Sequence, residues 1–224
     1  MKKTNKKITG MKWIFFDLDG TLADTVPALY DVYINFLNNF NKQGTRKEFA
    51  RLNGPSLPEI VLILKLKYNL KNNKEYLLEL YREKISNSYK KVMPMADAGI
   101  VLQRLNELNY KLMLVTSASR DIALRFISGQ GWQKYFQNYV FGNEVKKAKP
   151  DPAIYNLALK KAGITSSEVA VIEDSPNGIL SAKRAGILVV GLTDSKKSGI
   201  LLQAGADIVV PELQDVFSIF KQGG

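Results

Sequence analysis

Short runs of apolar residues recur along the chain, and polar or small residues follow each run. Continuous apolar runs of this length, without alternation, are typical of strands that are buried on both faces of a sheet. The runs occupy residues 12–16, 111–115, 139–141, 169–172, 187–190 and 208–210. They predict six strands at the centre of an α/β domain.

Apolar residues at helical spacing fill much of the chain between these runs. In residues 100–108, 154–162 and 213–220, apolar side chains recur three or four positions apart and so share one face of a helix. Asp151 and Ser175 are each followed by proline, a pair typical of a helix cap and the first helical position. Strands that alternate with helices predict right-handed crossovers and a Rossmann-like parallel sheet with helices on both faces.

The segment after the first strand has a different pattern. Apolar residues at helical spacing occur in residues 29–40, 58–68 and 75–89, and no strand pattern interrupts them. We therefore expect a small helical domain inserted into the main α/β domain. The expected division is residues 1–10 for a disordered basic tail, 11–25 with 93–224 for the main domain, and 26–92 for the insertion.

The composition narrows the chemistry that such a fold can perform. The 224 residues include no cysteine and no histidine, which excludes disulfides, thiolate zinc sites and histidine-based triads. General acid or base chemistry then falls to Asp, Glu, Lys or Tyr side chains. No apolar run reaches the roughly 18 residues that span a bilayer, and the run after the basic N-terminus is too short for a signal peptide. These features predict a cytoplasmic protein without a membrane partner.

The charge balance is basic, with 32 Lys and Arg against 21 Asp and Glu and a formal charge of +11. A basic surface can bind nucleic acid or a membrane. Here the lysines are scattered rather than interleaved with aromatic residues in one stripe, so we do not expect nucleic acid as the partner. A positive field also favours a substrate that carries phosphate.

Candidate functional residues collect where the predicted strands end. In an open parallel sheet, ligands bind beyond the carboxyl ends of the strands. Each candidate alone is explained by a turn, a helix cap or a solvated strand end, but together at one edge they indicate a site. They are Asp17, Asp19, Thr116, Ser117, Lys149, Glu173 and Asp174.

The chemistry of this group favours a magnesium site that handles phosphate. Asp17, Asp19 and Asp174 would repel one another, so a proton or a cation must neutralise part of their charge. Only hard oxygen ligands are on offer, and these suit Mg²⁺, which binds through a few carboxylates, waters and substrate phosphate. Lys149 and Thr116 add a fixed positive charge and a hydroxyl donor, which suit the oxygens of a phosphoryl group.

Four short motifs carry a family resemblance. Asp-Leu-Asp-Gly-Thr begins at Asp17, Val-Thr at Val115, Lys-Pro at Lys149 and Glu-Asp-Ser-Pro-Asn-Gly at Glu173. In order and spacing they resemble the haloacid dehalogenase-like superfamily over residues 12–191. The form of the last motif is similar to the sugar-phosphate phosphatase and β-phosphoglucomutase branch.

The resemblance implies a role for each matching residue. Asp17 is the implied nucleophile, which forms an aspartyl-phosphate, and Asp19 is the implied general acid and base. Thr116 and Lys149 complete the implied catalytic set and hold the phosphoryl oxygens. The implied Mg²⁺ ligands are Asp17, Asp19 through its main-chain carbonyl, Asp174 and, close by, Glu173. The implied phosphate-binding and substrate-binding residues are Leu18, Gly20, Thr21, Ser117, Ala118 and Lys149, with Arg51 and Asn53 from the insertion.

The insertion resembles the small helical cap of this superfamily, which closes over the site and contributes specificity residues. The hinge is expected at residues 20–25 and 92–95, and the specificity loop at residues 51–57. Arg51 either faces the substrate or is a solvated residue at a helix end, and the sequence favours neither.

Several activities are compatible with these motifs. Family members that cleave carbon–halogen bonds lack the second aspartate of the first motif, so Asp19 argues for phosphate esters. A phosphatase that acts on a small phosphomonoester is the prediction. A β-phosphoglucomutase-like mutase is less favoured, because Asn53 and Leu57 stand where that enzyme has basic residues and the chain has no cap histidine. A phosphoglycolate phosphatase-like activity and a non-catalytic, basic nucleic-acid-binding protein are the remaining alternatives.

Overall fold

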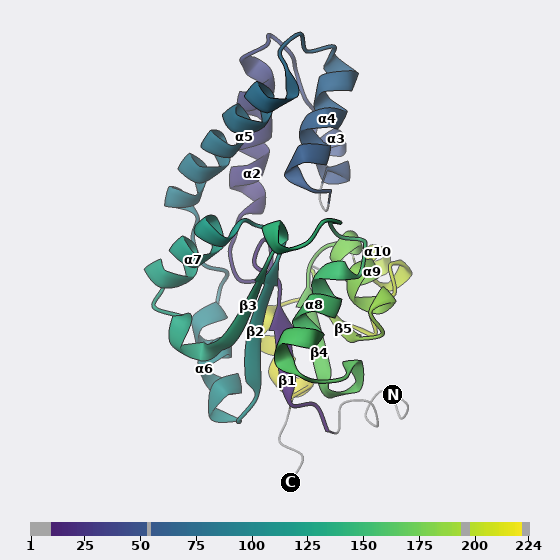
Figure 1. The fold of residues 1–224 in the computed structure, drawn as a ribbon. Coiled ribbons are helices and arrows are strands. Elements are labelled where there is room, and N and C mark those ends of the chain that lie inside the picture. Colours follow the sequence, from purple (N-terminus) through teal and green to yellow (C-terminus); the bar gives the residue numbers. More distant parts are fainter. Residues whose placement is uncertain (1–9, 53–54, 194–197, 221–224) are drawn as a thin grey trace.

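The computed structural model describes residues 10–52, 55–193 and 198–220. Its six strands form one parallel sheet in the order β3-β2-β1-β4-β5-β6 (Figure 1). The strands are β1 Trp13–Phe16, β2 Lys111–Thr116, β3 Phe136–Phe141, β4 Val169–Glu173, β5 Leu188–Leu192 and β6 Ile208–Val210. All six predicted strands are confirmed. Strand β3 begins at Phe136, ahead of its apolar run, because the first half of this edge strand is polar, with Gln137 exposed and Asn138 half-buried.

Alternate side chains of β1 supply two separate cores. Ile14 and Phe16 face one layer, Trp13 and Phe15 face the other, and all four are buried. The first layer consists of α6 Ala98–Glu107, α7 Arg120–Gly129 and the 3-10 helix η5 Leu213–Ser218. The second consists of α8 Ala153–Ala162, α9 Pro176–Arg184 and α10 Ser198–Gln203 (Figure 1). Burial on both faces explains the continuous apolar runs.

Helix starts follow the predicted signals with one shift. Ser175 caps α9, since its Oγ accepts a hydrogen bond from Gly178 N at 3.0 Å. Asp151 accepts from Ala153 N at 3.0 Å, but α8 begins one position later than predicted, with Pro152 as the capping residue. The apolar spacing did not indicate α7 or α10. Further short 3-10 helices are η2 Gln133–Tyr135, η3 Gly142–Glu144 and η4 Ser166–Glu168.

The inserted segment forms a separate helical body, the cap, beyond the carboxyl ends of the strands (Figure 1). Tyr33, Phe36 and Leu64 are fully buried within its own apolar cluster. Three of its helices stand where the spacing predicts them, whereas α3 was not indicated because none of its residues is buried. The cap consists of α2 Val26–Asn38, α3 Arg46–Arg51, α4 Leu57–Tyr68 and α5 Lys74–Ser88, followed by the 3-10 helix η1 Tyr89–Lys91.

The two linkers between cap and sheet are bonded to each other. Ala23 and Pro94 form an antiparallel bridge. On either side of it, Asp24 N donates to Met93 O at 2.9 Å and Met95 N donates to Leu22 O at 2.9 Å. The chain therefore leaves the sheet domain and returns to it at one point. No helix in the described part of the chain is both long and apolar enough to cross a membrane.

Candidate active site

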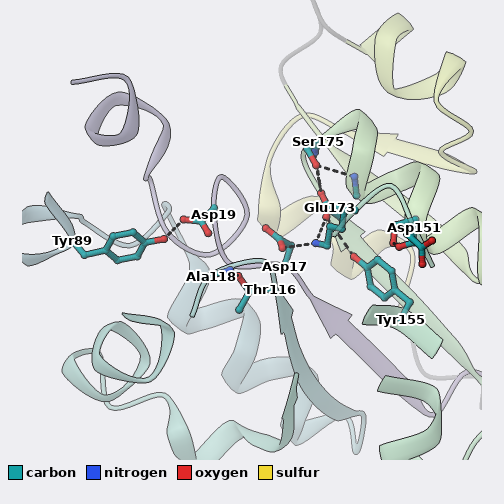
Figure 2. Close-up of polar contacts among 12 residues, drawn as sticks. Asp17, Asp19, Tyr89, Thr116, Ala118, Asp151, Tyr155, Glu173 and Ser175 are labelled. Carbon is teal, nitrogen blue, oxygen red and sulfur yellow. Dashed lines mark hydrogen bonds and ion pairs between the residues drawn. The ribbon is translucent and has the colours of Figure 1, made fainter. Parts of the chain in front are cut away.

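The site forms where the order of the sheet changes direction. Strand β1 is flanked by β2 on one side and β4 on the other, so the connections from β1 diverge and leave a crevice at its carboxyl end. Asp17 follows β1 directly, and its N–H donates to Ile172 O of β4 at 3.1 Å. Thr116 ends β2 and Glu173 ends β4, so three strands deliver polar side chains to this crevice (Figure 2).

Lys149 is held between two carboxylates. Its Nζ lies 2.7 Å from Asp17 Oδ1 and 2.6 Å from Glu173 Oε1, and the lysine side chain is only 3% exposed. Burial alone would lower the pKa of Lys149, but the charges of Asp17 and Glu173 outweigh it and hold that pKa well above its usual value. Lys149 is therefore a fixed ammonium beside Asp17. The cis peptide bond to Pro150 follows it.

Both carboxylate oxygens of Glu173 are engaged within the protein. Oε1 accepts from Lys149 and from the Tyr155 hydroxyl at 3.4 Å. Oε2 accepts from Ser175 N and Ser175 Oγ, each at 3.0 Å (Figure 2). A Cβ at Gly178 would lie 1.6 Å from Oε1, so α9 packs directly on this carboxylate. These contacts hold the Glu173 carboxylate in place against the ammonium of Lys149.

Three carboxylates come close enough to share a cation. Asp17, Glu173 and Asp174 each place one oxygen within 4.8 Å of the others. Gly20 has φ of +80°, and a Cβ there would lie 2.2 Å from Asp174 Oδ2, so only glycine permits this approach. The site is built to bring Asp174 against the loop that follows Asp17.

Burial and mutual repulsion disfavour the ionised forms of these carboxylates when no cation is present. Burial raises the pKa of Asp17 to about 8, with Lys149 lowering it and Glu173 and Asp19 raising it. Burial, followed by the charges of Glu173 and Asp17, raises the pKa of Asp174 well above its ordinary value. A hard divalent cation relieves this repulsion, and the all-oxygen donor set fits Mg²⁺.

Asp19 has a partner that the motifs did not indicate. Its Oδ1 accepts a hydrogen bond from the Tyr89 hydroxyl, which reaches across from η1 (Figure 2). Burial raises the pKa of Asp19, and the bond from Tyr89 acts in the opposite direction. Burial, together with the charge of Asp19, raises the pKa of Tyr89 well above its usual value, so its hydroxyl stays neutral. In the sequence Tyr89 is one more aromatic residue at the end of a predicted helix, so no local signal marks it.

Some of the residues expected to bind phosphate have their amides hydrogen-bonded inside the protein, and one, Ser117, is exposed in the cleft. Thr116 is fully buried and its Oγ1 accepts from Ala118 N at 3.0 Å. Gly20 N donates to Ala23 O at 2.8 Å and Thr21 N donates to Leu18 O at 3.2 Å. The amides of Ala118, Gly20 and Thr21 are thus engaged inside the protein. Ser117 is exposed and lines the cleft beside the site, and the Leu18 side chain lies in the apolar core.

A cleft of about 1890 Å³ separates the cap from these residues. Among the described residues that line it, Arg46 is the cap arginine nearest to the predicted specificity loop, and its guanidinium lies 4.5 Å from the centre of the Tyr30 ring. Arg51 ends α3, is exposed and is not among the lining residues. Asn53 lies outside the described residues. Of the two described cap arginines that line the cleft, Arg46 and Arg82, the one in α3 is therefore five positions ahead of the predicted Arg51.

Comparison with known families accounts for this arrangement. Residues 14–192 match the family described as haloacid dehalogenase-like hydrolases. That span includes every strand end that contributes to the site. The chain belongs to this family. The resemblance read from the four motifs and the expected Rossmann-like parallel sheet are both confirmed, and the protein is a haloacid dehalogenase-like hydrolase.

Relatives of this hydrolase match along almost its whole length. A phosphorylated carbohydrates phosphatase of Thermotoga maritima is 32% identical over 218 residues, covering 95% of this chain and 99% of the relative. A phosphoglycolate phosphatase of Photobacterium profundum is 25% identical, covering 96% and 98%. The crystal structure of a hydrolase from Pseudomonas syringae superposes with a TM-score of 0.81 at 26% identity, covering 93% and 97%.

Proposed function

We propose that this hydrolase is a Mg²⁺-dependent phosphatase that transfers the phosphoryl group of a small phosphomonoester to Asp17 and then to water. The observation that carries the proposal is the ammonium of Lys149, held 2.7 Å from Asp17 in a buried site. A cation so placed holds Asp17 in one orientation and can meet the charge of an incoming phosphoryl group. Asp19, as general acid and base, and Asp174, as a ligand of Mg²⁺, complete the proposed catalytic residues.

The first half of the reaction transfers the phosphoryl group. A carboxylate oxygen of Asp17 attacks phosphorus, and the bond between phosphorus and the ester oxygen breaks. Asp19 gives its proton to that leaving oxygen. Lys149 and Thr116 meet the charge on the other phosphoryl oxygens.

The second half regenerates the enzyme. Water attacks the phosphorus of the aspartyl-phosphate while Asp19, now a carboxylate, takes the proton from that water. The bond between Asp17 and phosphorus breaks, and inorganic phosphate leaves. Mg²⁺, when bound, would be held by Asp17, Asp174 and the main-chain carbonyl of Asp19, and it supplies positive charge that the carboxylates and the phosphate share.

The substrate class that we propose is a phosphorylated carbohydrate or a molecule of similar size. The match along the whole chain to a phosphatase of phosphorylated carbohydrates supports it, and so does the room in the cleft of about 1890 Å³. A mutase needs a second group that grips phosphate from the cap. Leu57, which opens α4, offers none. The cap arginines that line the cleft already have partners, since Arg46 lies over the Tyr30 ring and Arg82 pairs with Glu79 at 3.7 Å. We therefore expect release of inorganic phosphate rather than an isomeric sugar phosphate.

The test is Mg²⁺-dependent phosphate release from p-nitrophenyl phosphate, followed by a panel of sugar phosphates, phosphoglycolate and nucleotides. Asp17→Asn should abolish release, because an amide neither attacks phosphorus nor pairs with Lys149 in the same way. The matched control is Asp215→Asn in η5, an aspartate that does not line the cleft, which should retain wild-type turnover. Activity retained in Asp17→Asn would refute the assignment of the nucleophile.

A further inference from the structure

Tyr89 links the cap to the acid/base residue of the site. Its hydroxyl donates to Oδ1 of Asp19, a residue 70 positions away along the chain (Figure 2). We propose that Tyr89 is a positioning residue for Asp19, a role that rests on the phosphatase function proposed above. By holding Oδ1, the hydroxyl leaves Oδ2 to give and take the proton.

The linkers place Tyr89 where it can reach Asp19. Tyr89 begins η1, directly after α5, and Val92 N donates back to Tyr89 O at 3.4 Å. Shortly afterwards the chain pairs with the loop that carries Asp19, through the bridge between Ala23 and Pro94. The Tyr89 ring packs against the apolar cluster of the sheet domain. The contact is therefore supported from both ends and is not a chance meeting of two surface side chains.

The chemistry of the pair suits both halves of the reaction. A phenol hydroxyl can donate to Oδ1 whether Asp19 is a carboxylic acid or a carboxylate, because the proton that moves is on Oδ2. Because the hydroxyl is neutral, it orients Asp19 without forming an ion pair. A lysine in this place would form one and would hinder Asp19 in proton transfer. A fixed rotamer matters because a proton donor must lie within hydrogen-bond reach of the leaving oxygen.

The position of Tyr89 also connects the acid to the cap. Since η1 continues from α5, the Tyr89 hydroxyl joins this end of the cap to Asp19 in the sheet domain. Asp19 is then held in place for proton transfer with the cap seated over the substrate.

The experiment compares two substrates in Tyr89→Phe, with Mg²⁺ saturating. An alkyl phosphate from the active panel needs a proton on its leaving oxygen, whereas p-nitrophenyl phosphate hardly does. We expect kcat to fall about tenfold for the alkyl phosphate and less than about twofold for the aryl phosphate, with KM unchanged. In an Asp19→Asn background the same substitution should have no further effect. The matched control is Tyr110→Phe, which removes a hydroxyl from a tyrosine that packs on Phe220, away from the site.

Three results would overturn the inference. One is an equal fall of kcat for both substrates. Another is that Tyr89→Phe lowers kcat by the same factor in the Asp19→Asn background as in wild type. The third is wild-type behaviour of Tyr89→Phe on the alkyl phosphate. A wild-type enzyme that releases no phosphate from any substrate would instead refute the proposed function, and with it this role. Thermal unfolding of Tyr89→Phe close to that of wild type would show that the comparison concerns intact protein.

Discussion

Glu173 shows how its partners define the task of a single carboxylate. The sequence predicts it among the metal ligands, and one of its oxygens lies within 4.8 Å of oxygens of Asp17 and Asp174. Lys149, Tyr155 and Ser175 also donate to it. We propose that a carboxylate engaged in this way acts through the lysine that it holds. The distinction is measurable, because a metal ligand and a positioning residue respond differently to the concentration of Mg²⁺.

Glu173→Gln should lower kcat about 10-fold to 100-fold at saturating Mg²⁺, because an amide cannot accept from Lys149 and Ser175 at both ends. The Mg²⁺ concentration that gives half-maximal activity should stay close to that of wild type. The measurement is a Mg²⁺ titration of phosphate release. Glu144→Gln is the control, since Glu144 also accepts from a lysine at 2.7 Å and from a backbone N–H but does not line the cleft. Recovery of full activity by Glu173→Gln at high Mg²⁺ would indicate that Glu173 is instead a ligand of Mg²⁺.

Sequence reasoning reaches some residues of the site and not others, for a physical reason. Asp17, Lys149 and Asp174 stand next to strand ends or helix starts, so local patterns place them at the edge of the sheet. Tyr89 contacts Asp19 and Arg46 lines the cleft because the cap packs over the sheet domain. Their position depends on how the cap sits on the sheet, which no short stretch of sequence encodes.

At the scale of elements, the predicted strands agree well with the structure because burial on both faces leaves a strong apolar signal. Short helices leave a weaker apolar signal in the sequence. Helix α3 has no buried residue, and the 213–220 segment forms a 3-10 helix although its apolar residues have α-helical spacing. Helix α3 is held by the half-buried Phe49, whose ring lies 5.4 Å from that of Tyr30, and by polar contacts of Glu48. The Glu48 carboxylate accepts from the hydroxyls of Tyr33 and Tyr68 and pairs with Lys67.

This cluster predicts how the cap responds to acid. Burial would raise the pKa of Glu48, but the bonds from Tyr68, Tyr33 and Lys67 outweigh it and lower that pKa below the ordinary value of a glutamate. Its stabilising effect is then fully present above about pH 5 and is lost as pH falls through the lowered pKa. Glu48→Gln should reduce the free energy of unfolding by about 1 kcal/mol at pH 7 and by much less near pH 3.

Urea unfolding at the two pH values, followed by circular dichroism, measures this difference. The control is Glu79→Gln, because Glu79 is 76% exposed and its pairing with Arg82 at 3.7 Å should contribute little. An equal loss at both pH values in Glu48→Gln would mean that shape, and not charge, accounts for its role.

At the scale of the whole molecule, the site works against the stability of the fold. Asp17 and Glu173 are buried beside one lysine and Asp174 is half-buried next to them, so confining these charges costs free energy that a cation would restore. Adding Mg²⁺ at about 100 times its dissociation constant should stabilise the protein by about 2.7 kcal/mol. Thermal unfolding with Mg²⁺ and with EDTA should therefore differ by several degrees.

Asp174→Asn should remove most of that difference while raising the midpoint measured in EDTA, because it removes one of the mutually repelling charges. Ca²⁺-free buffers and matched ionic strength separate site binding from general screening. A shift of the same size in Asp174→Asn as in wild type would place the cation elsewhere.

The bridge between Ala23 and Pro94 has an evolutionary consequence. Because the cap leaves and rejoins the sheet domain at one point, the ends of the insertion already lie together, and its contents can change without parting the strands. Lineages could then acquire new substrates by exchanging the cap as a module. In the role that we propose for it, Tyr89 limits that exchange, because a replacement module must bring its own hydroxyl to Asp19 or leave that carboxyl without this donor.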